Sequence, residues 1–268
     1  MITVAIIGAG GRMGHALIRS VTRSDGMKLA AAIDQPDHPL IGRDAGLAAG
    51  IDELGVAISS DLADLSRADV VVDFTLPAAT DANVRAAAAA GKAIVIGTTG
   101  LGDAEKAALR DAAAAIPIVW APNMSLGVNL LFALVKKAAS ILGMGYRVEI
   151  DETHHVHKKD APSGTALRLG EKVAEGRGQD FKTVMVHDLD ESRADYTPDT
   201  IVMRSHREGE VVGDHTVGFA EEGETVEFMH HAWSREAFAM GALRAARWVL
   251  KKKPGLYDMQ DVLDLKGF

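Results

Sequence analysis

The fold of this chain is decided by the stretch Val4-Ala5-Ile6-Ile7-Gly8-Ala9-Gly10-Gly11-Arg12-Met13-Gly14. Its four leading apolar residues predict a strand buried on both faces, and helical spacing follows from Met13 to Val21. Because position 13 is Met, the glycines depart from a strict G-x-G-x-x-G pattern starting at Gly8. Glycine still permits a tight turn, and a helix N-terminus offers N–H groups to phosphates. The stretch Gly8-Ala9-Gly10-Gly11-Arg12-Met13-Gly14 therefore predicts a dinucleotide-binding loop.

An acidic residue stands where such a site needs one. Asp34 follows a second apolar run, Leu29 to Ile33, and lies about 20 residues beyond Gly14. Its carboxylate can accept hydrogen bonds from the adenosine ribose, and it repels a 2′-phosphate. The neighbouring Gln35 offers no cation, so both residues favour NAD(H) over NADP(H), although Arg12 could reach a 2′-phosphate. The alternative is a tight turn that the glycines merely cap.

The first half of the chain continues in the same rhythm. Apolar runs at 70–74, 93–96 and 116–120 predict strands, and segments near 78–90 and 103–115 predict helices. This alternation is typical of a parallel sheet with right-handed crossovers. Ligands of such sheets bind beyond the carboxyl ends of the strands. Two loops are therefore candidates for the nicotinamide end, unless they only cap the strands: Gly97, Thr98, Thr99 and Gly100, and Ala121, Pro122, Asn123 and Met124.

The pattern changes near Pro122. We expect helices over 126–142, 163–175 and 235–250, and strands over 147–153, 182–187, 200–207, 211–219 and 224–232. Glu208-Gly209 and Glu222-Gly223 look like hairpin turns, which favours antiparallel pairing. The sequence thus predicts an α/β protein: a Rossmann-type doubly wound parallel sheet, and a second α+β domain built on a mixed or antiparallel sheet. The boundary is expected near residue 126.

A dense group of cations lies in the second domain. Three histidines and two lysines fall within residues 154–159, and Ser163-Gly164-Thr165 then opens a helix that Ser163 can cap. Histidine titrates near neutral pH and lysine can donate a proton while holding an anion, so we favour acid–base chemistry on an anionic substrate. A solvated surface run is one alternative. A metal site is another, but H-E-x-x-H is absent and ligands at 154, 155 and 157 would point in different directions.

Composition narrows the functional classes. The chain has 268 residues, 47% hydrophobic and 25% charged, as in ordinary globular proteins, and roughly 150 residues per domain allows two domains. The absence of cysteine excludes disulfides, Cys-ligated zinc, iron–sulfur clusters and a thiol nucleophile. A net charge of −8 argues against broad binding to nucleic acid or anionic membranes. With no cationic leader before Val4, and with Lys136-Lys137 interrupting the longest apolar run, we expect a cytoplasmic protein.

Together these stretches resemble one family, the dihydrodipicolinate reductases (4-hydroxy-tetrahydrodipicolinate reductases) of the bacterial diaminopimelate–lysine pathway. The most specific string is His-His-x-His-Lys-x-Asp-Ala-Pro-Ser-Gly-Thr at 154–165. The other matching segments are Gly8 to Gly14, Asp73-Phe74-Thr75 with Pro77, Gly97 to Gly100, and Ala121 to Met124 continuing to Asn129. The resemblance covers essentially the whole chain. Met124 stands where an aromatic residue is common, and Gln35 where a basic residue can occur.

The resemblance implies reduction of 4-hydroxy-tetrahydrodipicolinate to tetrahydrodipicolinate, by hydride transfer to C4 of a cyclic imine. It implies that His154 is the proton donor or acceptor and Lys158 a proton donor, with the dicarboxylate bound by His155, Ser163, Gly164 and Thr165. The cofactor is expected to be NADH, NADPH or both, with a preference for NADH, held by residues 8–13, Asp34, 97–99 and 121–124.

The resemblance also implies an assembly. Residues 1–125, joined by 235–268, would form the dinucleotide-binding domain, and residues 126–234 the substrate-binding domain that builds a homotetramer. Two alternatives remain: another two-domain NAD(P) oxidoreductase, or a non-catalytic NAD(H)-binding regulatory protein. The lack of cysteine excludes a thiohemiacetal mechanism of the aldehyde-dehydrogenase kind. A His-based metal hydrolase is a third alternative, and insensitivity to chelators would count against it.

Overall fold

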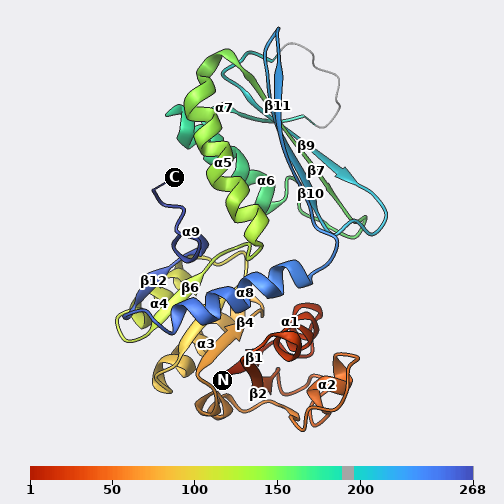
Figure 1. Ribbon diagram of the computed structural model, residues 1–268, viewed down its shortest axis with the longest axis vertical. Helices are drawn as coiled ribbons and strands as arrows, with labels where there is room; N and C mark the ends of the chain where they lie inside the picture. Colours follow the sequence, from red (N-terminus) through yellow and green to blue (C-terminus); the bar gives the residue numbers. More distant parts are fainter. Residues whose placement is uncertain (189–195, 268) are drawn as a thin grey trace. The chain divides into compact units, whose positions relative to one another are not determined.

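The computed structural model describes residues 1–188 and 196–267 and divides into two compact units (Figure 1). Unit 1 comprises Met1–Leu126 and Arg235–Asp264. Unit 2 comprises Gly127–Ser234 and the residues from Leu265 onward. Each unit has its own sheet and its own hydrophobic core.

Unit 1 is built on a parallel sheet in the order β12-β6-β5-β4-β1-β2-β3. Its strands are β1 (Ile2–Ile7), β2 (Met27–Ile33), β3 (Ile58–Ser59), β4 (Val70–Asp73), β5 (Ala93–Ile96), β6 (Pro117–Trp120) and β12 (Gly255–Tyr257). Its helices are α1 (Arg12–Arg23), α2 (Ala45–Ala48), α3 (Pro77–Ala89), α4 (Asp103–Ala112), α8 (Glu236–Val249) and α9 (Met259–Val262), with a 3-10 turn at Leu62–Arg67.

Alternate residues of the central strands feed two separate cores, one on each face of the sheet. On β1, Val4 and Ile6 pack with α1 and α8, whereas Ala5 and Ile7 pack with α3 and α4. These strand residues are fully or almost fully buried because helices cover both faces, which is why the strands read as continuous apolar runs. The predicted doubly wound sheet is confirmed.

Unit 2 carries a mixed sheet in the order β11-β10-β7-β9-β8. Its strands are β7 (Arg147–His154), β8 (Met185–His187), β9 (Ile201–Arg207), β10 (Asp214–Ala220) and β11 (Thr225–His231). Its helices are α5 (Leu126–Leu142), which begins at the boundary, α6 (Gly164–Arg177) and α7 (Phe181–Val184), with a 3-10 turn at Gly143–Gly145. Buried residues of α5 and α6 pack on the apolar face of β7, β9 and β10. The predicted second α+β domain is confirmed.

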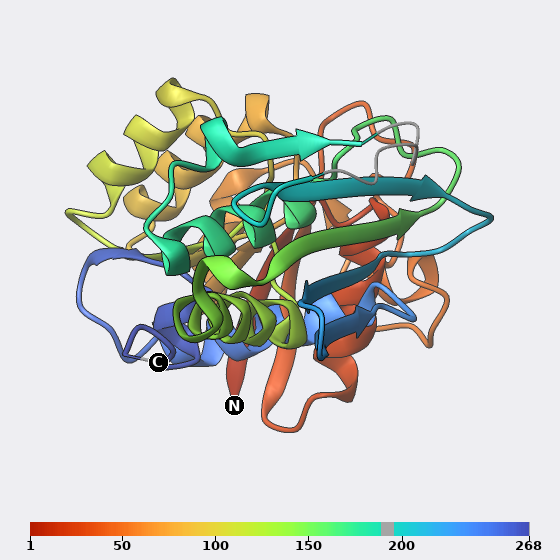
Figure 2. The same cartoon turned by 90° about the horizontal axis from the view of Figure 1, so that it is seen from above.

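Two sequence-based expectations for unit 2 are wrong. Glu208-Gly209 does not close a hairpin, because β7 lies between β9 and β10 (Figure 2). The connection instead crosses the end of β7, where the Glu208 N–H donates to His154 O at 2.8 Å. Residues 182–187 are not one strand, since α7 extends to Val184 and only Met185–His187 joins the sheet. The Glu222-Gly223 turn does join β10 to β11 as expected.

Helix α5 is the most apolar long helix of unit 2. Together with the following turn, Leu126–Gly145, it is long and apolar enough by length and composition to cross a membrane. Its buried face, however, belongs to the core of unit 2 through Val128, Leu131, Phe132, Val135 and Ala139. Packing of this helix on the sheet of unit 2 therefore explains its apolar composition.

Candidate active site

In unit 1, the predicted cofactor loops meet at one edge of the sheet. The strands are parallel, so the residues that follow β1, β2, β4, β5 and β6 all emerge at the same edge of the sheet. Gly8, Asp34, Gly97 and Ala121 are each the first residue after their strand. Open parallel sheets bind ligands at this edge.

The glycine loop is shaped by close backbone contacts. Gly8 has φ +83°, and a Cβ there would lie 2.7 Å from the carbonyl oxygen of Phe74. A Cβ on Gly14 would lie 2.1 Å from Gly8 O, so α1 packs against the loop at a distance that only glycine permits. Helix α1 starts at Arg12, and its N-cap, Gly11, makes no side-chain cap hydrogen bond. The loop and the uncapped first turn, which contains Arg12 and Met13, fit a pyrophosphate group.

Asp34 is held beside this loop by two backbone N–H groups. Gly10 N–H donates to its Oδ2 at 2.7 Å, and Gln35 N–H donates to its Oδ1 at 2.8 Å. Each carboxylate oxygen has a further lone pair, so the side chain retains the capacity to accept ribose hydroxyls. Ala9 is buried, and its N–H donates to Ile33 O at 3.0 Å, which ties the loop to the strand that ends at Asp34.

A cavity of about 600 Å³ opens beside these residues. Gly8, Gly11 and Asp34 line it, and so do residues that the sequence did not single out as cofactor contacts. Those residues are Ile7, Ile33, Gln35, Pro36, His38, Ser60, Leu62, Phe74, Thr75, Leu76, Ala78, Ala79 and Asn83. The cavity is largely apolar with a carboxylate at one wall, which fits the adenosine half of a dinucleotide.

The loop after β4 is fixed by a buried acid. Asp73 Oδ1 accepts hydrogen bonds from the Thr75 N–H at 3.0 Å and from its hydroxyl at 2.7 Å, and Asp73 Oδ2 accepts one from Asn83 Nδ2 at 3.0 Å. Burial raises the pKa of Asp73, and these hydrogen bonds oppose that shift. The network holds Phe74 and Thr75 against the cavity. Asp73-Phe74-Thr75 was noted in the sequence, but no spacing rule assigns it a contact.

The other two predicted loops lie at the same edge but do not line this cavity. Gly97 N–H donates to Asp73 O at 2.9 Å, Thr98 is buried and Thr99 is exposed. In the second loop, Ala121 N–H donates to Ile96 O at 3.2 Å, Pro122 is exposed and Asn123 is half-buried. The Met124 side chain lies in the core, so only its backbone can serve a ligand.

In unit 2, the predicted catalytic segment joins β7 to α6. His154 is the last residue of β7 and is buried, and Ser163 is the N-cap of α6, accepting a hydrogen bond from Ala166 N–H at 3.2 Å. The predicted capping role of Ser163 is confirmed. Gly164, exposed, and Thr165, half-buried, form the first turn of α6. Their position gives the segment the partial positive charge of a helix N-terminus.

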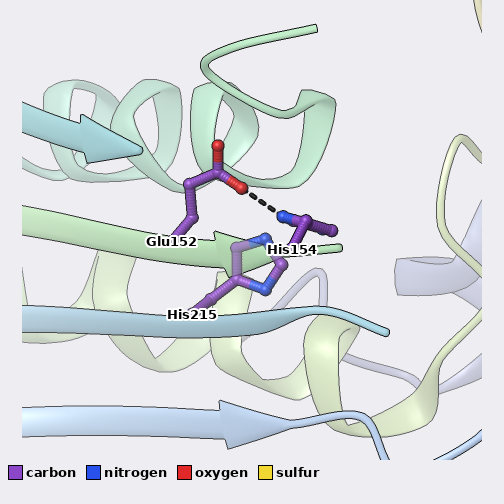
Figure 3. A group of neighbouring side chains, drawn as sticks. All are labelled: Glu152, His154 and His215. Atoms are coloured by element: carbon purple, nitrogen blue, oxygen red, sulfur yellow. Dashed lines mark hydrogen bonds and ion pairs between the residues drawn. The ribbon is translucent and has the colours of Figure 1, made fainter. Parts of the chain in front are cut away.

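A buried carboxylate lies next to His154. The Nδ1 atom of His154 forms a hydrogen bond with Glu152 Oε2 (Figure 3). Burial opposes ionisation of Glu152, but the hydrogen bond and charge of His154, together with the charge of Arg207, outweigh it and hold the pKa of Glu152 at about 2. Glu152 is therefore ionised near neutral pH. The sequence analysis missed this residue, although its position two before His154 on a strand places both side chains on one face.

His215, on β10, completes the group. Its ring lies edge-on to that of His154 with centroids 5.1 Å apart, and its Nε2 is 3.2 Å from Ser163 Oγ. Burial, and then the charge of His154, lower the pKa of His215 to about 3. His215 is thus a neutral, buried histidine that packs against the catalytic candidate.

This shift predicts a pH-dependent stability. Between pH 6.5 and about pH 3 the unfolded chain binds a proton on His215 that the folded chain does not. The free energy of unfolding therefore falls as pH falls, by about 2 kcal/mol from pH 8 to pH 5. In urea titrations across this range we expect His215→Asn to flatten the dependence. His157→Asn, at a side chain that is 73% exposed, serves as the control and should leave it unchanged. An equal slope in all three proteins would contradict the assignment.

The other histidines and the two lysines of residues 154–159 differ in burial. Lys158 Nζ lies 2.8 Å from Asp160 Oδ2 with its side chain mostly buried, whereas Lys159 is exposed. Burial opposes ionisation of Asp160, but the Lys158 ammonium outweighs it and lowers the pKa of Asp160. His155 is half-buried, and His157 pairs with Glu210 on the surface. Because β7 ends at His154 and a turn follows, the apparent cluster divides into one buried, one half-buried and one exposed histidine.

The metal alternative takes a different form in the structure. In the described parts of the chain, one group of three candidate ligands exists, and it comprises Glu152, His154 and His215. Their candidate ligand atoms all lie within 4.8 Å of one another, and two of them already share a hydrogen bond. The arrangement fits a hydrogen-bonded acid–base pair better.

Comparison with known proteins covers both units. A family model described as the N-terminus of dihydrodipicolinate reductase matches residues 2–124, and one described as its C-terminus matches residues 127–263. The 4-hydroxy-tetrahydrodipicolinate reductase of Alkalilimnicola ehrlichii is 51% identical over 263 residues, which is 98% of each chain. That of Laribacter hongkongensis is 52% identical over 264 residues, again 98% of each.

Solved structures agree with the fold. A dipicolinate-bound dihydrodipicolinate reductase from Paenisporosarcina sp. TG-14 aligns with a TM-score of 0.73 at 26% identity, covering 97% of this chain and 98% of that one. A probable dehydrogenase from Thermotoga maritima aligns with a TM-score of 0.65 at 11% identity, covering 98% and 93%. The second likeness concerns the fold alone.

Proposed function

This chain belongs to the dihydrodipicolinate reductase family, and we propose that it reduces 4-hydroxy-tetrahydrodipicolinate to tetrahydrodipicolinate in the diaminopimelate route to lysine. The observation that carries the proposal is the match to curated reductases over 98% of both chains. It spans the dinucleotide-type sheet and the histidine segment together. A binding protein or a dehydrogenase with another substrate domain would share only the first of these.

The substrate is a dicarboxylate, and unit 2 offers groups suited to one. The first turn of α6, with Ser163, Gly164 and Thr165, presents backbone N–H groups to one carboxylate, and His155 and the Lys158 ammonium supply donors for the other. The structure of the Paenisporosarcina relative contains dipicolinate, a planar dicarboxylate of the same class. In this proposal the α6 turn orients the ring and Lys158 offsets its negative charge.

The chemistry divides between cofactor and protein. A bound reduced nicotinamide supplies the hydride that adds to C4 of the cyclic imine. Electron density then moves toward the ring nitrogen, and an acid must protonate the resulting enamine. His154 and Lys158 are the candidates to hold and deliver that proton. The hydroxylated substrate also loses water.

The cofactor is NADH or NADPH, and we propose a preference for NADH. Asp34 stands at the end of β2 with both oxygens directed by backbone N–H groups, and Gln35 beside it carries no charge. A 2′-phosphate placed beside Asp34 would be repelled, whereas ribose hydroxyls can donate to it. The residues proposed to hold the cofactor are Gly8, Ala9, Gly10, Gly11, Arg12, Met13, Asp34, Gly97, Thr98, Thr99, Ala121, Pro122, Asn123 and Met124.

Replacing Asp34 by alanine tests this preference. We expect NADH affinity to fall by roughly 10-fold, because NADH loses the hydrogen bonds of its ribose hydroxyls to Asp34. NADPH affinity should fall by less, because the variant also removes the repulsion between Asp34 and the 2′-phosphate. Both cofactors lose the tether that Asp34 provides to Gly10, so neither should be unaffected. Asp37→Ala, at an exposed carboxylate on the same loop outside the cavity lining, is the matched control. Equal losses for the two cofactors in fluorescence titrations would refute the ribose contact.

A coupled assay tests the function. Aspartate semialdehyde, pyruvate and the preceding synthase generate the substrate, and oxidation of NADH and NADPH is followed by absorbance. We expect oxidation that depends on all three components. A chain that binds NADH without oxidising it would be a regulatory protein instead, and oxidation that requires a different substrate would indicate another oxidoreductase.

We also propose a cytoplasmic homotetramer that assembles through unit 2. In the described part of unit 2, α5 and α6 pack on one face of the sheet, and edge strand β11 exposes Met229. An exposed edge with apolar side chains supports association through this sheet. Sedimentation equilibrium measures the mass of the assembly directly.

A further inference from the structure

Both carboxylate oxygens of the buried Glu152 accept hydrogen bonds. Its Oε2 accepts the hydrogen bond of His154 Nδ1. Its Oε1 accepts two more, from Arg207 Nη2 at 3.1 Å and from Ser163 N–H at 3.2 Å. The side chain has no exposed surface. A buried carboxylate is costly unless it is paired and hydrogen-bonded on both oxygens, and here both conditions hold.

Arg207 links this carboxylate to the loop that carries the other catalytic candidate. Its Nε donates to Lys158 O at 3.3 Å, and its Nη2 donates to Asp160 O at 2.5 Å as well as to Glu152. One guanidinium therefore fixes the carboxylate and the backbone of residues 158–160 together. Movement of Glu152 would disturb both.

The charge of Glu152 determines which nitrogen of His154 carries a proton. A carboxylate has no proton to donate, so His154 Nδ1 must be the donor in their hydrogen bond. In the singly protonated ring the proton is then on Nδ1, and Nε2 is the nitrogen that gains or loses the second proton. From the doubly protonated ring, it is then Nε2 that can give up a proton.

Space has been left beside that nitrogen. Gly213 lies at the start of β10 with φ outside the left-handed region, so its backbone does not require glycine. A Cβ at this position would lie 2.9 Å from His154 Nε2, closer than real side chains pack. Glycine at 213 keeps Nε2 unobstructed. Gly218, five residues further on in β10, has no such constraint. A Cβ added there would have Glu149 O as its nearest neighbour, at 3.9 Å.

We propose that Glu152 is a positioning residue that fixes His154 as the proton donor through Nε2, with Arg207 holding Glu152 in place. This rests on the proposed reductase function and specifies which atom completes the reaction. The proton moves from Nε2 to the enamine carbon, and His154 is left neutral with its Nδ1–H still donated to Glu152. Lys158, whose ammonium pairs with Asp160, then offsets the negative charge of the substrate.

The same two strands provide a matched control. Glu149 lies on β7 and accepts a hydrogen bond from Arg204 Nη1 on β9 at 2.8 Å, as Glu152 does from Arg207. Both pairs are 55 residues apart in sequence, but within residues 1–188 and 196–267 Glu149 forms no hydrogen bond with a histidine. We expect Glu152→Gln to lower kcat by about 100-fold or more with little change in KM, and Glu149→Gln to retain wild-type kcat. Glu152→Asp should recover part of the loss.

Nuclear magnetic resonance of ¹⁵N-labelled histidine reports the mechanism separately from turnover. Where the His154 ring of the wild-type enzyme is neutral, we expect it to carry its proton on Nδ1. In Glu152→Gln, whose amide can donate as well as accept, we expect a mixture of both ring forms. Gly213→Ala should lower kcat by at least 10-fold, with Gly218→Ala as its control.

The outcomes separate the two proposals. Wild-type enzyme that does not reduce the substrate would refute the reductase function itself. Active wild-type enzyme with equal kcat in the Glu152→Gln and Glu149→Gln variants would refute the positioning role. If Glu152→Gln does not fold, the wild-type spectrum decides, because a His154 proton on Nε2 in the neutral ring would overturn the proposal.

Discussion

The His154→Gln enzyme is expected to lose a factor of about 10² to 10⁴ in kcat, the range for a general acid in proton transfer. Glutamine keeps a polar group of similar length in the buried position at the end of β7, but it cannot hold an exchangeable ring proton. Dinucleotide affinity should stay within about 2-fold, because the candidate cofactor residues belong to unit 1. Steady-state kinetics and fluorescence titration with NADH measure the two quantities.

His157→Gln is the control for this experiment. It removes a histidine three residues away whose side chain is 73% exposed, pairs with the surface residue Glu210 and lies 6.0 Å from His155 between ring centroids. Its kcat should match that of the wild-type enzyme. Normal turnover in His154→Gln would remove His154 from the mechanism, and equal losses in both variants would show that the segment acts through its fold instead of through one ring.

Replacing Lys158 by alanine is expected to reduce kcat/KM by roughly 100-fold, which is the scale of losing a charge-assisted contact to an anion in a partly dry site. The loss has two parts. The substrate loses a cation, and Asp160, which accepts a hydrogen bond from Lys158 at 2.9 Å, loses its ammonium partner. Steady-state kinetics with saturating NADH measures the change.

Lys159→Ala provides the matched comparison, since Lys159 is adjacent but exposed. We expect less than a 2-fold change, because a solvated surface charge contributes little. If the two lysine variants behave alike, the Lys158 ammonium contributes only to the general field of the segment. Wild-type kcat/KM in Lys158→Ala would exclude a role in catalysis or substrate binding.

Local patterns were sufficient for most of unit 1. Continuous apolar runs gave the long central strands, and the glycines with Asp34 gave the edge at which the loops gather, because each signal lies within a few residues of the structure it specifies. The short elements between residues 45 and 67, and β12 with α9 after residue 254, were not predicted. These elements span only two to six residues, and none contains the continuous run of four apolar residues that marks the central strands.

The strand order of unit 2 could not be predicted for a different reason. The Glu208-Gly209 dipeptide has a hairpin composition, yet β9 pairs in parallel with β7, which is more than 40 residues earlier in the sequence. Pairing at that separation is decided by burial of the Val148, Ile150 and Met203 face against α5 and α6. A turn signal describes only its own neighbours.

The candidate site shows the same division. His154, Lys158 and Ser163 stand in one readable string, so the sequence indicated them together. The partners that determine what His154 can do come from β9 and β10: Arg207 is 53 positions from His154 and His215 is 61 positions away. Neither belongs to a local motif, and only the folded sheet brings them to the end of β7.

The central claim is hydride transfer from a nicotinamide to C4 of the substrate ring, and isotope transfer tests it most directly. The enzyme would be supplied with NADH carrying deuterium on the transferred position and with enzymatically generated substrate, and the product analysed by mass spectrometry and NMR. The account predicts one deuterium per product molecule, located at C4 of tetrahydrodipicolinate. Oxidation of the cofactor without label at C4, or no oxidation at all, would contradict it.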